Sequence, residues 1–362
     1  MAEPFKNLFN KKLVEEFANN IYRYDSSFKK EEYLDLVLMK LESLELKDRM
    51  RLISSSIHPY LENDYKKTIE ILKKVKTHFS ASESMGLQSM ILPDYIEVYG
   101  LNDYETSIDA LEYFTIESSS EFAIRHFIVK YENESMQEFR RWAKSDNEHI
   151  RRLASEGCRP RLPWAIALPS FKKDPTLVFE VLELLKNDES IYVRKSVANN
   201  LNDISKDNPD LVINFVKNNL DKSKNLDWIC KHASRTLLKA GDKKILELFG
   251  YKSDDSFSIN NFNVDKQVEE GEKLNFTFDL ETLKKSLGNI RLEYAIDFQK
   301  ANGKLSRKVF MLSQSTINND KKSFKKYQSF KTVTTRKYYK GLHKLAIIVN
   351  GEEKAITDFE LV

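Results

Sequence analysis

The sequence predicts a mainly α-helical chain, a solenoid of helical hairpins, that ends in a β-sandwich. Apolar residues recur every three to four positions before about residue 255 and every second position after it. All eight prolines lie at or before Pro209, whereas five of the ten glycines fall in the last 107 residues. Because the apolar period and the turn-forming residues change at the same point, we expect two domains, 1–255 and 256–362.

The first domain is predicted to be an array of helices. Early segments with helical spacing are 13–22, 31–44, 65–75 and 85–98. Three later segments repeat one another at offsets of 43 and 36 residues: 150–156 (IRRLASE), 193–199 (VRKSVAN) and 229–235 (ICKHASR). An amphipathic stretch, 175–186, and an acidic turn, 187–189, precede the second of these. This pattern is typical of HEAT-like repeats, which stack into a curved solenoid with a long binding surface.

The second domain is predicted to consist of strands. Alternation is clearest at Leu274, Phe276, Phe278 and Leu280, and Asn302-Gly303 is a turn signal. The expected strands are 273–280, 290–299, 308–312, 328–333, 342–349 and 355–362. Several short strands in about 107 residues favour an immunoglobulin-like β-sandwich. The domain lacks a cysteine pair, so this class rests on the alternation alone.

Several classes of protein are disfavoured by composition. No run approaches the roughly 18 apolar residues of a membrane span, and the N-terminus lacks the apolar segment of a signal peptide. Two cysteines and six histidines without paired spacing give no support for a disulfide scaffold or a metal site. No glycine-rich nucleotide motif or common hydrolase motif occurs. We expect a soluble, cytoplasmic protein without a cofactor or a metal.

Charge is unevenly distributed along the chain. Residues 1–255 hold 39 basic and 42 acidic residues, whereas residues 256–362 hold 19 and 13. Within the second domain, residues 300–344 contain thirteen basic residues and one acid, with six aromatic residues among them. Contact with a polyanion is the favoured interpretation. The alternative is a lysine-rich edge that protects exposed strands from pairing.

Charged side chains four residues apart follow the second helices of the repeats. With Ile150 and Val193 in the core, these side chains should point away from it on one face. They pair Arg152 with Glu156, Lys195 with Asp203 through Asn199, Lys231 with Arg235, and, one residue out of register, Glu121 with Arg125. Ordinary surface ion pairs, each worth a few tenths of a kcal/mol, are the alternative.

The surroundings of Arg152 favour a binding surface for an anion. Residues 139–173 hold nine basic and three acidic residues, including Arg159 and Arg161. Isolated acids on such a surface repel phosphates, which suggests that they stabilise a positive charge. Trp164 comes three residues after Arg161. It is either a stacking platform for a base or a core tryptophan under a loop.

The sequence resembles the AlkC-type DNA alkylation repair proteins, a family of HEAT-like repeat alkylpurine DNA glycosylases with an immunoglobulin-like module. The resemblance covers the whole chain. The segments that carry it are 1–9 (MAEPFKNLF), 118–127 (SSSEFAIRHF), 151–169 (RRLASEGCRPRLPWAIALP), 193–205 (VRKSVANNLNDIS) and the strand-rich tail. Residues 151–169 are the most specific of these.

The resemblance implies excision of 3-methyladenine and 3-methylcytosine from duplex DNA, without drawing the base into a deep pocket. It implies a catalytic centre of acidic and aromatic residues, which we carry onto Glu121, Glu156, Asp203 and, for lesion contact, Trp164. The expected phosphate contacts are Arg125, Arg152, Arg159, Arg161, Lys195, Lys231 and Arg235. The expected partner is double-stranded DNA with alkylated bases. We expect the protein to be a monomer that associates with the nucleoid. A non-catalytic HEAT-repeat scaffold or a lesion-binding protein is the alternative, and release of free base separates them.

Overall fold

The computed structural model describes residues 4–61, 64–78, 83–332 and 337–362, without the side chains of 83–85. The described residues fall into two compact units. The first comprises Met1–Val212 and Asn219–Ala233, and the second comprises Ile213–Asn218 and Ser234–Val362. No helix in these described stretches is long and apolar enough to cross a membrane.

The first unit is built from helices. In chain order they are η1 (Phe5–Leu8), α1 (Lys11–Tyr24), α2 (Lys30–Leu41), α3 (Leu46–Ser55), η2 (His58–Tyr60), α4 (Tyr65–Lys76), α5 (Glu83–Gln88), α6 (Ile91–Tyr99), α7 (Tyr104–Thr115), α8 (Ile124–Lys130), α9 (Glu132–Trp142), α10 (Glu148–Gly157), α11 (Pro169–Lys173), α12 (Thr176–Leu185), α13 (Ile191–Ile204) and α15 (Lys224–Ala233). Helix α14 (Pro209–Asn219) lies where the two units divide.

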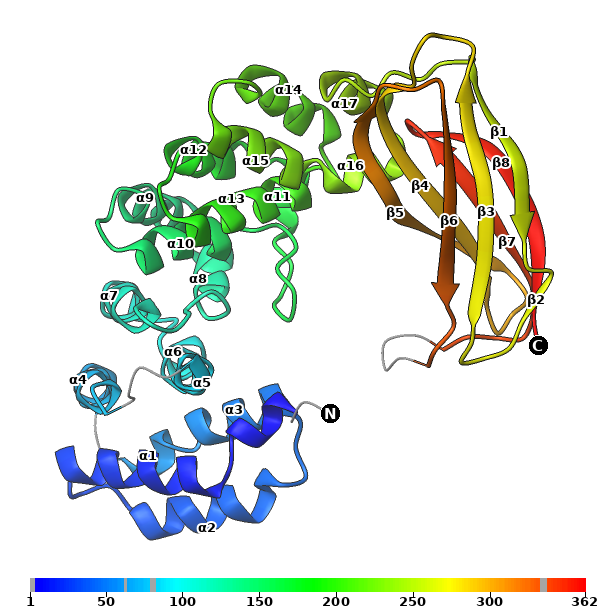
Figure 1. The fold of residues 1–362 in the computed structure, drawn as a ribbon. Coiled ribbons are helices and arrows are strands. Elements are labelled where there is room, and N and C mark those ends of the chain that lie inside the picture. Colours follow the sequence, from blue (N-terminus) through cyan, green and yellow to red (C-terminus); the bar gives the residue numbers. More distant parts are fainter. Residues whose placement is uncertain (1–3, 62–63, 79–82, 333–336) are drawn as a thin grey trace. The chain divides into compact units, whose positions relative to one another are not determined.

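Helices α9 to α13 form the repeating hairpins that the sequence predicts. The side chains of Asn147 and Ser190 cap α10 and α13 by accepting the backbone N–H groups of His149 and Tyr192. Within this unit α9 packs on α12, α10 packs on α13, and α13 packs on α15 (Figure 1). The second helices of successive hairpins are therefore neighbours, which brings residues about 40 positions apart into contact.

Two expected helical segments are interrupted. A continuous helix over 85–98 would place Pro93 in its interior, where proline cannot donate to the residue four positions earlier. The chain instead starts α6 at Ile91, which puts Pro93 in the first turn. The segment 229–235 ends with α15 at Ala233, and Arg235 begins α16. Lys231 and Arg235 are thus on different helices, and their predicted pairing on one helix face is wrong.

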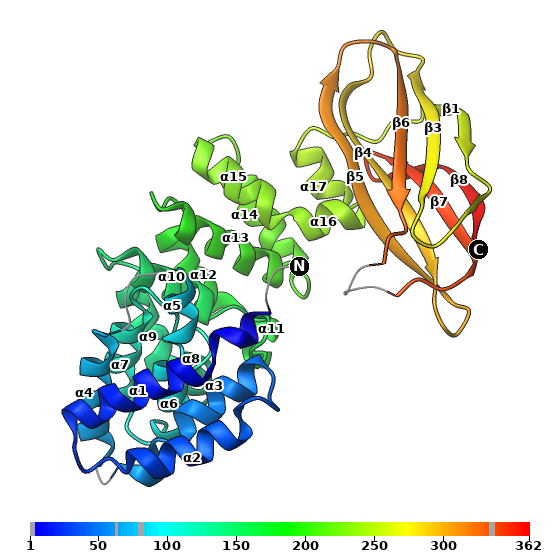
Figure 2. The ribbon, with the colours of Figure 1, turned by 60° about the horizontal axis from the view of Figure 1, so that its bottom comes forward.

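The second unit holds a sandwich of two sheets, seen in both ribbon views (Figures 1 and 2). Its strands are β1 (Phe257–Val264), β2 (Gln267–Val268), β3 (Lys273–Thr282), β4 (Gly288–Gln299), β5 (Leu305–Ile317), β6 (Lys321–Ser329), β7 (Gly341–Val349) and β8 (Glu352–Leu361). One sheet has the order β1-β3-β6 and the other β2-β8-β7-β4-β5. All pairs are antiparallel except β2 with β8.

The core of the sandwich follows the predicted alternation. Leu274, Phe276, Phe278 and Leu280 of β3 are buried against apolar residues of β4 and β7. The predicted fold class, helical repeats followed by an immunoglobulin-like sandwich, is confirmed.

Strand β6 departs from the prediction. The sequence predicts a strand over 328–333, whereas β6 runs from Lys321 to Ser329. Residue 333 lies outside the described residues. Only Phe324 and Gln328 of this edge strand are buried, so lysines hide the alternation that the sequence analysis relied on.

Two short helices belong to the second unit, α16 (Arg235–Ala240) and α17 (Lys243–Leu248). The turn between them meets the β7–β8 turn: a Cβ on Gly241 would lie 3.0 Å from the carbonyl oxygen of Gly351. A Cβ on Gly351 would overlap the side chain of Leu246. Both glycines have positive φ, so a side chain at either position would strain the backbone.

Candidate active site

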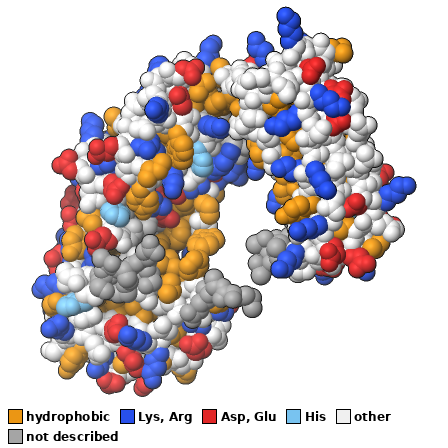
Figure 3. All heavy atoms as spheres, viewed as in Figure 1, with side chains coloured by type: hydrophobic (Ala, Val, Ile, Leu, Met, Phe, Trp, Pro, Cys, Tyr) orange, Lys and Arg blue, Asp and Glu red, His pale blue; other side chains and the backbone are white. Residues whose placement is uncertain are grey.

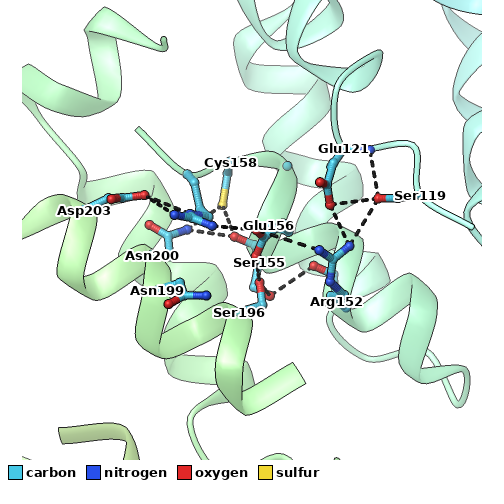
Figure 4. Close-up of polar contacts among 12 residues, drawn as sticks. Ser119, Glu121, Arg152, Ser155, Glu156, Cys158, Ser196, Asn199, Asn200 and Asp203 are labelled. Atoms are coloured by element: carbon cyan, nitrogen blue, oxygen red, sulfur yellow. Dashed lines mark hydrogen bonds and ion pairs between the residues drawn. The ribbon is translucent and has the colours of Figure 1, made fainter. Parts of the chain in front are cut away.

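A row of alternating acids and arginines lies where α10 packs on α13 (Figure 4). Helix α10 supplies Arg152 and Glu156, and the chain directly after this helix supplies Arg159. Glu121 comes from the turn before α8, and Asp203 from the last turn of α13. The structure therefore brings together the three acids that the sequence analysis singled out.

Glu121 and Arg152 form one end of the row. A guanidinium nitrogen of Arg152 lies 2.6 Å from Oε2 of Glu121, and the Ser119 hydroxyl donates to the same oxygen at 2.8 Å. The guanidinium also lies over the Tyr192 ring, 4.8 Å from its centre. The Arg152 side chain is consequently held from two sides.

Arg159 joins the other two acids. Its Nη1 donates to Oε1 of Glu156 at 2.6 Å, and its Nε donates to Oδ2 of Asp203 at 2.8 Å. Lys206 donates to the second oxygen of Asp203 at 2.9 Å. Side-chain exposure is 7% for Glu156 and 3% for Asp203, so both acids are removed from bulk water.

Two serine hydroxyls complete the hydrogen bonding of Glu156. Ser155 donates to Ser196, and Ser196 donates to Oε2 of Glu156, each at 2.6 Å. Ser196 lies on the buried side of α13 between Val193 and Val197. A hydroxyl at an apolar helix position was the sequence signal for this contact, and the sequence analysis missed it.

The charges of the row balance one another. Glu121, Glu156 and Asp203 face Arg152, Arg159 and Lys206. Burial by itself lowers the pKa of Arg159, but the nearby charges of Glu156 and Asp203 outweigh it, and the pKa lies above its ordinary value. The pKa of Arg152 is raised against burial in the same way by Glu121 and Glu156. Such a row keeps carboxylates at fixed positions, where they can stabilise a positive charge on a bound molecule.

The structure corrects the predicted direction of two acids and the predicted role of two arginines. Glu156 and Asp203 were expected to point away from the core, yet both lie in the packing interface of α10 and α13. Arg152 and Arg159, expected to hold phosphates, are instead ion-paired with these acids and with Glu121.

Arg125 also differs from its expected role. Its side chain is fully buried and donates to the backbone carbonyls of Gly157, Arg159 and Ile166 at 2.7 to 2.9 Å. A buried guanidinium that is bonded to carbonyls cannot reach a phosphate. Phosphate binding by Arg125 therefore does not agree with the structure.

The remaining candidates lie nearer the surface. Lys195 on α13 and Lys231 on α15 are exposed, and Arg161 is half-buried and makes two hydrogen bonds to Asp207. Arg235 belongs to the second unit. Trp164 is 63% exposed, so the interpretation as a core tryptophan is wrong.

The thiol of Cys158, next to the row, is not activated as a nucleophile. Cys158 is fully buried, and burial raises the pKa of its thiol to about 12. Among the described residues, no group of three or more His, Cys, Asp or Glu side chains is arranged to hold a metal ion.

Comparison with known proteins places this architecture in a family. A family model described as "DNA alkylation repair enzyme" matches residues 102–237, which include the whole row. A second, described as "Uncharacterised protein YhaZ, C-terminal Ig-like domain", matches residues 258–362.

Two full-length relatives cover both units. The chain is 43% identical over 359 residues to "Uncharacterized protein YhaZ" of Bacillus subtilis (strain 168), covering 98% of this chain and 99% of the relative. It is 35% identical to the Pseudomonas fluorescens alkylpurine DNA glycosylase AlkC, solved bound to DNA containing an abasic site analog. The TM-score is 0.94, and the match covers 99% of this chain and 100% of that one. The chain therefore belongs to the DNA alkylation repair enzyme family, and within it to the AlkC type.

Proposed function

We propose that the chain is a DNA glycosylase that removes cationic N3-methylated bases, 3-methyladenine and 3-methylcytosine, from duplex DNA. The observation that carries the proposal is the row of three carboxylates on Arg152 and Arg159. The AlkC structure supports it, because that relative is an alkylpurine DNA glycosylase and was solved with DNA containing an abasic site analog.

The charge of the substrate base simplifies the reaction. Water forms a bond to C1′ of the deoxyribose, and the electrons of the C1′–N bond move into the base ring. The base then leaves as a neutral molecule, so no acid has to protonate it. The proton released from the water passes to a carboxylate or to solvent.

What needs stabilising is the positive charge that develops on the sugar, as in glycosidases. In our proposal Asp203 or Glu156 faces the sugar and orients the water. Glu121 and the remaining acid hold the cationic base. Glu121 suits that role, because its side chain is the most exposed of the three acids at 13%. Removing one preorganised group of this kind costs on the order of 10²–10³ in rate.

Contact with DNA is assigned to exposed residues. Trp164 would touch the lesion or its sugar from an exposed position, which fits a base that is not enclosed in a deep pocket. Lys195, Lys231, Arg161 and Arg235 would hold phosphates, giving affinity without reading sequence.

The second unit adds a basic surface. Lys and Arg side chains are spread over the β-sandwich (Figure 3), and residues 300–344 supply many of them, although 333–336 lie outside the described residues. We propose that this stretch contacts the duplex as well.

The test is chromatography of bases released from methylated DNA by the wild-type protein and the variants Glu156→Gln and Asp203→Asn. Release of 3-methyladenine by wild type, with a loss of about 100-fold or more in either folded variant under single-turnover conditions, is expected. If both variants stay within about threefold of wild type, the assigned acids are wrong.

A matched control separates chemistry from stability. Asp188 accepts two hydrogen bonds from Arg151, and its side chain is only 5% exposed, near the opposite end of α10. Asp188→Asn makes the same chemical change in a similar buried pair outside the row. It should leave base release unchanged at temperatures where it is folded.

A further inference from the structure

Trp164 is presented by an unusual backbone. It lies in the loop 158–168 between α10 and α11 and has a φ of 65°, a left-handed conformation that is uncommon for a large side chain. The residue is 63% exposed, so packing around the indole does not hold it there. Contacts to the loop backbone have to supply the restraint.

Arg125 supplies one set of these contacts. Its Nη1 donates to the carbonyls of Gly157 and Arg159 at the start of the loop, at 2.9 and 2.7 Å. Its Nε donates to the carbonyl of Ile166 near the end, at 2.7 Å. One buried guanidinium therefore ties together the two sides of the loop that carries Trp164.

Lys47 supplies a contact at Trp164 itself. Its ammonium, on α3, donates to the carbonyl of Trp164 at 2.6 Å and lies 5.3 Å from the centre of the Phe122 ring. Phe122 follows Glu121 directly. Lys47 therefore links the tryptophan loop to the turn that carries one acid of the row.

We propose that Arg125 and Lys47 are positioning residues that hold the loop 158–168 so that Trp164 is preset for its contact with the damaged nucleotide. The inference rests on the proposed function and deepens it. Neither residue contacts the lesion in this scheme. They act through the backbone on either side of Trp164, and Lys47 gives an early helix of the chain a part in the site.

The bonding of Arg125 supports this role. Burying a guanidinium is unfavourable unless it is bonded, and Nε and Nη1 of Arg125 are bonded to three carbonyls of one chain segment, whereas its buried Nη2 has no partner among the described residues. None of these acceptors is a carboxylate. Burial accordingly lowers the pKa of Arg125 to about 10. A buried charge bonded in this way fixes a backbone rather than an ion pair.

The experiment uses Lys47, because replacing the buried Arg125 risks unfolding. The full-length protein is labelled with 5-fluorotryptophan, and the resonance of Trp164 among the three tryptophans is assigned with Trp164→Phe. Lys47→Met should shift or broaden the Trp164 resonance while the Trp142 and Trp228 resonances stay in place. Lys47→Arg, which can donate to the same carbonyl, should restore it.

Lys130→Met is the matched control. Lys130 is also exposed, donates to a backbone carbonyl, that of Leu101, at 2.9 Å, and lies 5.1 Å from the centre of the Tyr131 ring. The variant Lys130→Met should leave all three tryptophan resonances unchanged. An unchanged Trp164 resonance in Lys47→Met would overturn the proposal.

Function is read in two ways that separate the two proposals. Lys47→Met should raise the DNA concentration for half-maximal excision about tenfold, at a thermal stability similar to that of wild type. The reason is that misplacing a contact by about 1 Å can lower the reaction rate by up to about 100-fold. It should also weaken binding to DNA with an abasic-site analogue. A shifted resonance with unchanged excision and binding contradicts the role of positioning. A shifted resonance and weaker binding, without base release by wild type, would support positioning and reject the glycosylase.

Discussion

Two groups of buried arginines and carboxylates in this chain use the same chemistry differently. In the row between α10 and α13, Arg159 faces two acids, and each acid has further donors from other helices or turns. On β4, Arg291 and Glu293 are neighbours on one strand, 2.5 Å apart at their closest, and both are almost fully buried. Burial raises the pKa of Glu293 despite Arg291.

The difference shows what a buried charge needs in order to serve as a site. In the row, several cations and hydroxyls surround the acids, and the pKa of each arginine is raised against its burial. On β4 burial stays dominant at Glu293, although Arg291 and the more distant charge of Lys239 both lower its pKa. The row is thus suited to holding carboxylates ready for a cation, whereas the β4 pair is an ion pair within one strand.

The largest effect is expected when the row loses its shared cation. Arg159→Met leaves Glu156 and Asp203 buried without the cation that they share, which should cost about 3–5 kcal/mol of the free energy of unfolding. Urea denaturation of the full chain measures it. Arg161→Met is the control, because Arg161 pairs with Asp207 near the surface and should contribute about 0–1 kcal/mol. Equal losses in the two variants would mean that the row is no different from a surface pair.

A smaller effect is expected from the serine that supports Glu156. Ser196→Ala removes the hydrogen bond to Oε2 of Glu156 and leaves that oxygen with one donor fewer, a loss of about 1–3 kcal/mol in stability. Single-turnover excision should fall about tenfold as the carboxylate becomes less well placed. Ser107→Ala is the control, since Ser107 is similarly buried on α7, donates to the carbonyl of Gly100 at 2.9 Å and lies outside the row. Excision unchanged in Ser196→Ala would show that the hydroxyl only fills space.

The sequence predicted architecture better than side-chain direction. Apolar period and turn residues located the helical hairpins and most strands, because those signals reflect the local chain. Exposure of Trp164 could not be predicted, since it depends on a left-handed backbone held by distant Lys47 and Arg125. Burial of Asp203 likewise depends on where Arg159 arrives after α10 ends.

Exposed cations should behave unlike the buried ones. Lys195 and Lys231 are exposed, so replacing either by Gln should change stability by less than about 0.5 kcal/mol. If each contacts a phosphate, the slope of log affinity for DNA against log salt should fall by about one for each variant. Saturating single-turnover excision should be retained. An unchanged slope in both variants would mean that neither lysine contacts a DNA phosphate.

The smallest effect tests the β4 pair by pH. Because the pKa of Glu293 in the folded chain lies above its ordinary value of 4.5, the folded protein takes up this proton first as the pH falls. The contribution of Glu293 to stability therefore increases from neutral pH down to about 4.5 and is lost again as the pH rises. Glu293→Gln has no such titration. As the pH falls, the unfolding free energy of wild type should therefore increase relative to that of the variant. Chemical denaturation at several pH values measures it. Movement in the opposite direction would mean that Arg291 outweighs burial, and the β4 pair would then resemble the row.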